Sequence, residues 1–282
     1  MFLVNDDNFK ISQMKKNNIF LSATIIAGVA LVFSCKSSTG NKQDDSAAAD
    51  TIAQQVEQAP NTLTDAEKQD GWVLLFDGKT ADGWRGHNKT AFPDSGWEVA
   101  DGNLHCIESG TGEAGNGGDI IYDKKFKDFE FSMEWKISEG GNSGIFYLAQ
   151  EKKGDPIWKS SPEMQILDNV KHPDAKLGKD GNRMAGSLYD LIPAVPQNAK
   201  PAGEWNKASI MVYQGTVVHY QNGEKVLEYH LWTDDWKNMI NNSKFKGWDD
   251  FLNAGGKDKQ GFIGLQDHGN DVWFRNIKIK TM

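Results

Sequence analysis

The sequence predicts an all-β fold, a β-sandwich of the jelly-roll kind with one short helix. Three observations predict it. Many short segments alternate apolar with polar residues, turn-forming dipeptides separate these segments, and only one segment has a convincing helical pattern. With no strand–helix alternation along the chain, a parallel α/β sheet is not expected.

The first predicted strands surround two Asp-Gly turns. The segment GWVLLFDG gives an apolar strand that ends at Asp77-Gly78, and Asp101-Gly102 in GWEVADGNLHCIES is a strong hairpin signal. Residues 129–136 then alternate, with polar residues between apolar ones, as in an antiparallel strand with one buried face. The apolar positions of that strand are Phe129, Phe131, Met133 and Trp135.

The second half of the chain continues the pattern. NSGIFYLA follows a glycine turn, residues 207–231 hold two or three strands joined at Gln214-Gly215 and Asn222-Gly223, and residues 259–282 hold two more around Asp267-His268-Gly269. The helical pattern lies at 233–245, where Thr233 is the expected N-cap before two acidic residues.

The N-terminal segment resembles a bacterial lipoprotein signal. A basic start at Met14-Lys15-Lys16 precedes an apolar run over residues 19–33 and then Ser34-Cys35, so Cys35 is the expected lipidation site and mature N-terminus. Residues 1–13 are interpreted as an upstream start-site extension. The alternative is a transmembrane helix, but the run is shorter than the roughly 20 residues that a span needs.

Composition limits what the rest of the chain can be. Residues 36–62 are poor in apolar side chains and predict a disordered tether, which leaves 63–282 as one domain. A formal net charge of −8 without a Lys/Arg cluster argues against nucleic acid, whereas ten Trp residues suit carbohydrate or a large β core. Cys106 has no partner for an intramolecular disulfide and is expected to pack within a strand.

Eight segments occur in an order that resembles the 3-keto-disaccharide hydrolase family. They are GWVLLFDGKTADGW, DFEFSMEWKIS, GGNSGIFYLA, PEMQILD, GSLYDLIP, EWNKASIMVYQGTVVHYQNG, SKF and GFIGLQDHGNDVWFRNIKIK, spread over residues 70–282. The resemblance implies a concanavalin A-like (lectin/glucanase) jelly roll. It also implies an exported lipoprotein of the periplasm, outer membrane or cell surface, and cleavage of glycosides whose sugar is oxidised to a ketone at carbon 3.

That activity has a simple chemical logic. A ketone at C3 acidifies the C2 proton, so a base can form an enediolate and the C1 substituent can leave by elimination; water addition then completes a net hydrolysis. Direct hydrolysis is the other route. A sugar 3-dehydrogenase that makes the ketone is a candidate partner. Two rival functions are a non-catalytic carbohydrate-binding module of the same fold and a conventional endoglycanase with two carboxyl groups.

The strand PEMQILD carries the first candidate residues. Glu163 and Gln165 share a face of a regular strand, and Asp168 joins them if one extra residue bulges between, as is common beside active sites. Glu163 and Asp168 are expected to be catalytic, as a base or as oxygen ligands, and Gln165 to bind substrate. The alternative is a polar rim on a solvated sheet face.

Histidines supply the next candidates. His268, in LQDHGND, is the third expected catalytic residue because imidazole titrates in the useful range, and Gln266 beside it is expected to bind substrate. A histidine hydrogen-bonded in a tight turn is the alternative. His172, before Pro173, is a weaker substrate-binding candidate that could equally be exposed.

The remaining expected substrate ligands are Asn142, Tyr189, Asp190 and Arg275. Tyr189 could stack on a sugar, and Arg275, expected on the same face as Trp273, Ile277 and Ile279, needs an acidic partner such as Glu163, Asp168 or Asp190. A structural ion pair is the alternative for Arg275. No cofactor is certain. A divalent metal ion is a further hypothesis, and its candidate ligands are Glu163, Asp168, His172, Asp190 and His268.

Overall fold

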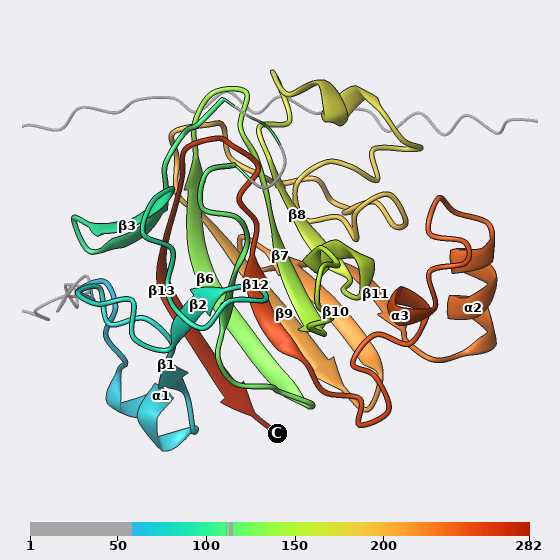
Figure 1. Cartoon of the computed structure of the whole chain (residues 1–282), viewed down its shortest axis with the longest axis horizontal. Coiled ribbons are helices and arrows are strands. Elements are labelled where there is room, and N and C mark those ends of the chain that lie inside the picture. Colours follow the sequence, from blue (N-terminus) through green and yellow to red (C-terminus); the bar gives the residue numbers. More distant parts are fainter. Residues whose placement is uncertain (1–57, 111, 113–114) are drawn as a thin grey trace, which may run out of the picture. The chain divides into compact units, whose positions relative to one another are not determined.

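Two antiparallel sheets pack against each other in the computed structural model, which describes residues 58–110, 112 and 115–282 (Figure 1). The predicted signal, Cys35 and most of the predicted tether lie outside these described residues. The described part holds three short α-helices, two 3-10 turns and thirteen strands, so the all-β jelly-roll class is confirmed.

The elements occur in the following order: α1 Asp65–Gln69, β1 Val73–Leu74, β2 Trp84–Gly86, β3 Trp97–Ala100, β4 Asn103–Cys106, β5 Ile120–Tyr122, β6 Phe129–Ile137, β7 Asn142–Ala149, η1 Ile157–Lys159, β8 Glu163–Leu167, η2 Pro173–Lys176, β9 Asn206–Tyr213, β10 Thr216–Gln221, β11 Glu224–His230, α2 Asp234–Asn241, α3 Asp249–Leu252, β12 Phe262–Leu265 and β13 Val272–Thr281.

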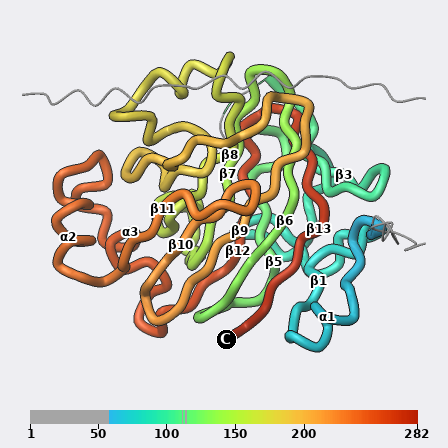
Figure 2. Tube along the Cα trace, turned by 180° about the vertical axis from the view of Figure 1, so that it is seen from behind, coloured from blue at the N-terminus to red at the C-terminus, as the bar shows by residue number. Residues whose placement is uncertain are grey.

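The larger sheet has eight strands. Seven follow the order β11-β10-β9-β6-β13-β4-β3, and β1 pairs with β13. Figure 2 shows β11, β10, β9, β6 and β13 side by side. The smaller sheet has the order β2-β5-β12-β7-β8, so β8 is an edge strand. Strands distant in sequence become neighbours in both sheets, as a jelly roll requires.

The main hydrophobic core fills the space between the sheets. The alternating residues of β6 supply its centre, and Phe129, Phe131, Met133 and Trp135 are all buried, as predicted. Cys106 is also fully buried, on β4. Its thiol pKa is raised by burial, so it is a packing residue and not a nucleophile.

A buried polar network crosses this core. The Tyr147 hydroxyl lies 2.8 Å from His219 Nε2 and 2.6 Å from the Tyr229 hydroxyl, and His219 Nδ1 lies 3.0 Å from the Gly186 carbonyl oxygen. A carbonyl only accepts, so His219 carries its proton on Nδ1 and Tyr147 donates to Nε2. His219 therefore fixes the chain at Gly186. Burial lowers its pKa to about 4.

The predicted turns form as their residue types require. Asp101-Gly102, Gln214-Gly215 and Asn222-Gly223 all have positive φ at both positions, the geometry of the tight hairpin turn. They connect β3 to β4, β9 to β10 and β10 to β11.

Helix α2 confirms the predicted helix, because the Thr233 hydroxyl accepts from the Trp236 N–H. Two further short helices were not predicted. Helix α1 begins with a capping box between Thr64 and Glu67, and ion pairs of Glu67 with Lys278 and of Asp70 with Lys280 attach it to β13. Helices α2 and α3 lie together beside the β10–β11 edge (Figure 1).

Strand β13 changes phase in its middle. Asn276 has φ +54°, and the pairing with β6 shifts between Arg275 and Lys278. Ile277 is therefore buried while Arg275 and Trp273 lie on the solvent side. The expectation that Arg275 shares a face with Ile277 and Ile279 is wrong, because strict alternation does not survive the bulge.

The domain begins before the predicted end of the tether. Asn61 is buried, its side chain donates to the Gly102 carbonyl at 2.8 Å, and it exchanges two hydrogen bonds with Asn276.

In the described residues, no helix combines the length and apolar character that a membrane crossing needs.

Candidate active site

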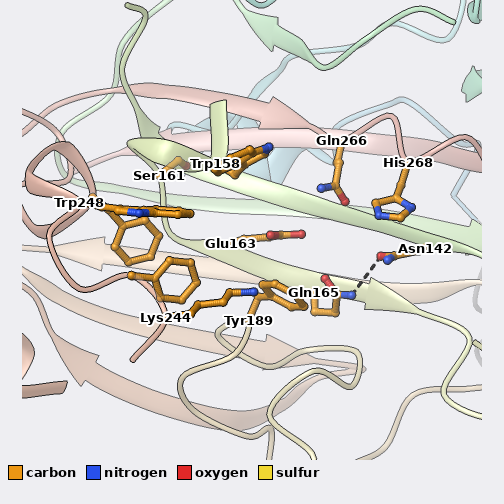
Figure 3. Close-up of a pocket in the computed structure, with 12 residues that line it drawn as sticks. Asn142, Trp158, Ser161, Glu163, Gln165, Tyr189, Lys244, Trp248, Gln266 and His268 are labelled. Atoms are coloured by element: carbon orange, nitrogen blue, oxygen red, sulfur yellow. Dashed lines mark hydrogen bonds between the residues drawn. The ribbon is translucent and has the colours of Figure 1, made fainter. Parts of the chain in front are cut away.

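A pocket lies on the outer face of the five-stranded sheet (Figure 3). Its cavity volume is about 220 Å³. Its lining comes from β7, β8, the turn after β12 and three connecting segments. The lining residues are Asn142, Trp158, Ser161, Glu163, Gln165, Tyr189, Lys244, Phe245, Trp248, Phe251, Gln266 and His268.

The pairing of β7 with β8 sets the centre of the pocket. Phe146 is opposite Glu163 and Gly144 is opposite Gln165, so Glu163 and Gln165 share the outer face, as predicted. A β-carbon on Gly144 would lie 2.0 Å from Glu163 Oε1. The missing side chain of Gly144 therefore makes the space in which the buried Glu163 carboxylate lies.

Three amide side chains form the polar side of the pocket. Gln165 Nε2 donates to Asn142 Oδ1 at 3.0 Å (dashed line in Figure 3), which orients both amides. The Oε1 atoms of Gln165 and Gln266 are buried and accept no hydrogen bond from any residue that the structure describes. Buried acceptors without donors are costly, so both atoms are suited to accept hydrogen bonds from the hydroxyl groups of a ligand.

His268 lies on the same side as these amides, in a turn that Asp267 holds in place. The buried Asp267 carboxylate accepts from the backbone N–H groups of Gly117, Gly118 and Gly269, each at 3.0 Å. These bonds fix the backbone on both sides of His268, so its imidazole is presented to the pocket by a rigid turn.

Tyr189 reaches the pocket from the segment that runs along the free edge of β8. Its backbone N–H donates to the Glu163 carbonyl at 3.0 Å, and its hydroxyl donates to Asp174 at 3.0 Å. The Lys244 ammonium lies 4.1 Å from the centre of the Tyr189 ring. Burial and the Asp174 charge raise the pKa of Tyr189.

Aromatic rings form the opposite side. The Trp158 and Trp248 ring centres lie 5.2 Å apart, and Phe245 stacks on Phe251 at 4.4 Å. Figure 3 shows Glu163 between Trp248 on one side and Gln266, His268 and Asn142 on the other, with Trp158 beside it. The pocket thus has two chemically different ends with one carboxylate between them.

Asp168 lies outside the pocket lining, contrary to the sequence prediction. The register of β7 with β8 runs without a shift, so the predicted bulge is wrong. The Asp168 carboxylate instead accepts from the backbone N–H groups of Gly140, Val170 and Lys171, and these bonds outweigh burial and lower its pKa. Its role is to close the turn after β8.

His172 and Asp190 lie next to the pocket without lining it. The His172 ring meets the His268 ring edge to face at 6.2 Å, its Nδ1 accepts from the Asp174 N–H, and burial lowers its pKa. Asp190 forms an ion pair with Arg183 and lies 3.5 Å from Lys244 Nζ. His172 therefore packs against the lining residue His268, and Asp190 lies beside the lining residue Lys244.

Arg275 belongs to the other sheet. Its Nε donates to Glu134 at 2.7 Å, and its guanidinium lies 4.0 Å from the centre of the Trp205 ring. It has none of the acidic partners that the sequence suggested, since the Asn276 bulge turns it to the outer face of the eight-stranded sheet. Arg275 therefore forms a structural ion pair with Glu134, on the sheet that does not carry Glu163.

The five candidate metal ligands are not gathered into one site. Asp168 is saturated by backbone N–H groups and Asp190 by Arg183. Over the described residues, no group of three or more His, Cys, Asp or Glu side chains is placed to hold a metal ion. As far as the structure describes them, these five side chains therefore do not form a metal site.

The lining residues missed from the sequence are those of the aromatic side, with Ser161 and Lys244. Trp158 lies on η1. Lys244, Phe245 and Trp248 lie in the segment between α2 and α3, and Phe251 lies on α3. Their signal was the run SKFKGWDDF, in which aromatic residues recur beside a short helix. Only the fold shows that this run reaches β8.

Together, the fold and the site define a jelly-roll protein whose pocket has unsatisfied amide acceptors at one end and aromatic rings at the other. Residues 71–280 match the family described as the 3-keto-alpha-glucoside-1,2-lyase-like domain, and the chain belongs to this family. It is 50% identical over 290 residues to the 3-keto-disaccharide hydrolase of Bacteroides thetaiotaomicron, covering 95% of this chain and all of that protein.

Solved structures agree with the fold. A candidate glycosyl hydrolase from Parabacteroides distasonis has 30% identity and a TM-score of 0.68, over 79% of this chain and all of that chain. A second candidate glycosyl hydrolase from the same organism has 27% identity and a TM-score of 0.57, over 75% of this chain and 99% of that chain.

Proposed function

We propose that this protein cleaves the glycosidic bond of 3-keto-glycosides by removing the C2 proton and expelling the C1 substituent. The family and the name of the 50% identical relative support the substrate class. Water adds to the resulting enone, so the overall reaction is a hydrolysis that releases the 3-keto sugar and the aglycone.

The observation that supports this chemistry best is the single carboxylate in the pocket. A conventional glycosidase places two carboxyl groups across the scissile bond. Among the twelve lining residues only Glu163 is acidic, and the nearby Asp168 and Asp190 are engaged elsewhere. One carboxylate beside amides, a histidine and a lysine suits proton abstraction next to a ketone.

Each group has a distinct role in the proposal. Glu163 takes the C2 proton. The electron pair of the broken C2–H bond forms the enediolate, whose negative charge develops on the C3 oxygen. His268 and the Gln266 amide lie on the polar side, where they can donate hydrogen bonds to that oxygen. The enediolate then collapses, the C1–O bond breaks, and the departing oxygen takes a proton. Lys244, which lines the pocket beside Tyr189, can donate that proton.

The test compares a 3-keto-glucoside with its unoxidised parent in deuterated water, followed by NMR. Elimination predicts cleavage of the keto compound only, with deuterium at C2 of the product. Cleavage without deuterium would mean direct hydrolysis. Cleavage of the parent would identify a conventional glycosidase, and binding without cleavage would identify a carbohydrate-binding module. Repeating the assay with EDTA tests whether a metal ion is needed.

Export and lipidation at Cys35 belong to the same proposal. An extracytoplasmic lipoprotein would meet glycosides before uptake, and a sugar 3-dehydrogenase would have to supply the ketone. The prediction is that Cys35→Ala abolishes incorporation of labelled palmitate into the protein in a lipoprotein-processing host. Persistent labelling would contradict it.

A further inference from the structure

Two tryptophan rings form most of the aromatic side of the pocket. Trp158 and Trp248 are both half-buried, their ring centres lie 5.2 Å apart, and their planes are inclined by 35°. Phe245 and Phe251 are 4% and 3% exposed and pack against Trp248. The tryptophan rings are therefore held by buried neighbours while part of each remains open to a ligand.

The two segments that carry these rings hold each other in place. Trp158 lies on η1, and Trp248 is the residue directly before α3. Elements η1 and α3 are in contact, and an ion pair of 3.2 Å between Lys152 and Asp250 joins the turn before η1 to α3. Rings on segments that are already ordered bind a ligand at little conformational cost.

Two polar side chains, Ser161 and Lys244, line the pocket beside these rings. The Ser161 hydroxyl donates to the Tyr147 carbonyl at 3.0 Å, so its oxygen can also accept a hydrogen bond. The Lys244 ammonium lies 3.5 Å from Asp190 and has three N–H groups, so it can donate to a ligand as well. The aromatic side thus offers ring faces, one acceptor and one donor.

A pyranose ring has the matching chemistry. Its faces carry C–H groups, which are weakly positive and stack on the electron-rich face of an aromatic ring. Its hydroxyl groups lie around the rim, where Ser161 can accept from one and Lys244 can donate to another. A small alkyl group would contact only the rings, and the two polar groups would lose water without a replacement.

We propose that the aromatic side is the subsite for the leaving sugar of a 3-keto-disaccharide, and that Trp158 and Trp248 select a second pyranose over a small alkyl group at C1. Figure 3 shows Trp158 beside Glu163 and Trp248 on the side away from the polar residues. The inference rests on the proposed function, since it places the 3-keto sugar at the amides and the leaving sugar across Glu163 from it.

The experiment measures kcat/KM for a 3-keto-disaccharide and for the methyl 3-keto-glucoside of the same anomer. Methanol and a sugar hydroxyl differ as leaving groups, so the ratio of the two values in the unaltered chain mixes reactivity with binding. The change in that ratio on substitution does not. We expect Trp158→Ala and Trp248→Ala each to lower the ratio of disaccharide to methyl compound by about tenfold.

Two further variants complete the kinetic test. Trp205→Ala is the matched control, because Trp205 is a half-buried tryptophan that contacts Arg275 on the other sheet. It should change neither value. Ser161→Ala alters no ring and removes one acceptor, so it should lower the ratio by roughly fivefold, even where a tryptophan variant does not fold. Equal losses on both substrates in the pocket variants would overturn the assignment of the aromatic side.

Calorimetric binding to the Glu163→Gln protein, with and without Trp248→Ala, keeps this inference separate from the proposed function. We expect the disaccharide to bind more tightly than the methyl compound and Trp248→Ala to remove most of that difference. If the unaltered chain cleaves neither compound, the proposed function fails, and this binding difference still decides the subsite. If both are cleaved but the difference is missing, the proposed function stands and the leaving-sugar subsite is wrong.

Discussion

The Glu163 carboxylate occupies the space that a side chain at position 144 would take: a β-carbon on Gly144 would lie 2.0 Å from Glu163 Oε1 and 2.7 Å from its carboxyl carbon. The absence of a side chain at Gly144 on β7 therefore makes room for the proposed base, Glu163, on the neighbouring strand β8. Ordinary carbon–oxygen contacts are much longer, so the two groups exclude each other.

Gly144→Ala should move Glu163 and suppress turnover while the domain stays folded. We expect kcat/KM to fall by about 100-fold, since small displacements of a catalytic group are costly. Thermal unfolding and kinetics on a 3-keto-glucoside check it. Gly223→Ala is the control: with φ +86° it strains a hairpin turn remote from the pocket, so it should lower stability and leave kcat/KM unchanged. Normal turnover of Gly144→Ala would contradict the assigned base.

Glu163→Gln and Asp168→Asn should separate chemistry from structure. Loss of a general base predicts a fall in kcat of about 10²- to 10⁴-fold for Glu163→Gln. Asp168→Asn keeps the shape but weakens three bonds to backbone N–H groups, so it should cost about 1 to 3 kcal/mol of unfolding free energy with a much smaller effect on kcat. The reverse pattern would restore Asp168 as the catalytic residue.

His268→Leu should reduce kcat more than His172→Leu does. His268 lines the pocket, whereas His172 contacts its ring from outside. Leucine has no side-chain donor, and removal of one donor to a developing oxyanion predicts a loss of about 10²- to 10³-fold for His268→Leu. His172→Leu should stay within about tenfold because His172 acts only through His268. Steady-state kinetics of both variants decide the order, and equal losses would point to a shared role.

The buried His219 should make the fold sensitive to mild acid. Its pKa is lowered from 6.5 to about 4, so between these values the unfolded chain binds a proton that the folded chain does not. Stability from this group is present above pH 6.5 and is lost as the pH falls towards 4, by about 3 kcal/mol in all.

Urea unfolding at several pH values between 7 and 4.5 measures this loss. His219→Gln is the control, since an amide can still donate to Gly186 and accept from Tyr147 but does not titrate. The pKa values of His87 and His172 are also lowered by burial, so the difference between the two proteins isolates His219. Parallel pH profiles would be inconsistent with the neutral buried histidine.

Arg275→Gln should leave turnover unchanged and lower the unfolding free energy by less than about 1 kcal/mol. Arg275 and its partner Glu134 lie at the surface of the eight-stranded sheet. Kinetics and urea unfolding provide the measurement. A large fall in kcat would show that this sheet takes part in the reaction.

Most of the sheet pattern could be predicted from the sequence because it depends on local rules. Turn pairs such as Asn222-Gly223 and the alternation of Phe129 to Trp135 are determined by backbone geometry and by burial of one face. The phase change at Asn276 could not be predicted, because a left-handed residue inside a strand depends on its pairing with β6.

The site divides in the same way. Glu163 and Gln165 follow from strand alternation alone, and both line the pocket. Asp168 was misplaced because a side chain that caps its own turn has the same composition as one that faces a ligand. Lys244 and Trp248 were missed because their approach to β8 depends on long-range packing of the segment after α2, which no local pattern encodes.

The two sides of the pocket also differ in how readily their supporting segments can change. The carboxylate and the amides are held by paired strands, where a change of register would disturb the whole sheet. The aromatic residues come from η1 and the segment after α2, which connect strands and can be lengthened or exchanged without breaking a ladder. Changes in these connections can therefore alter the aromatic side of the pocket while the paired strands keep the carboxylate and the amides in place.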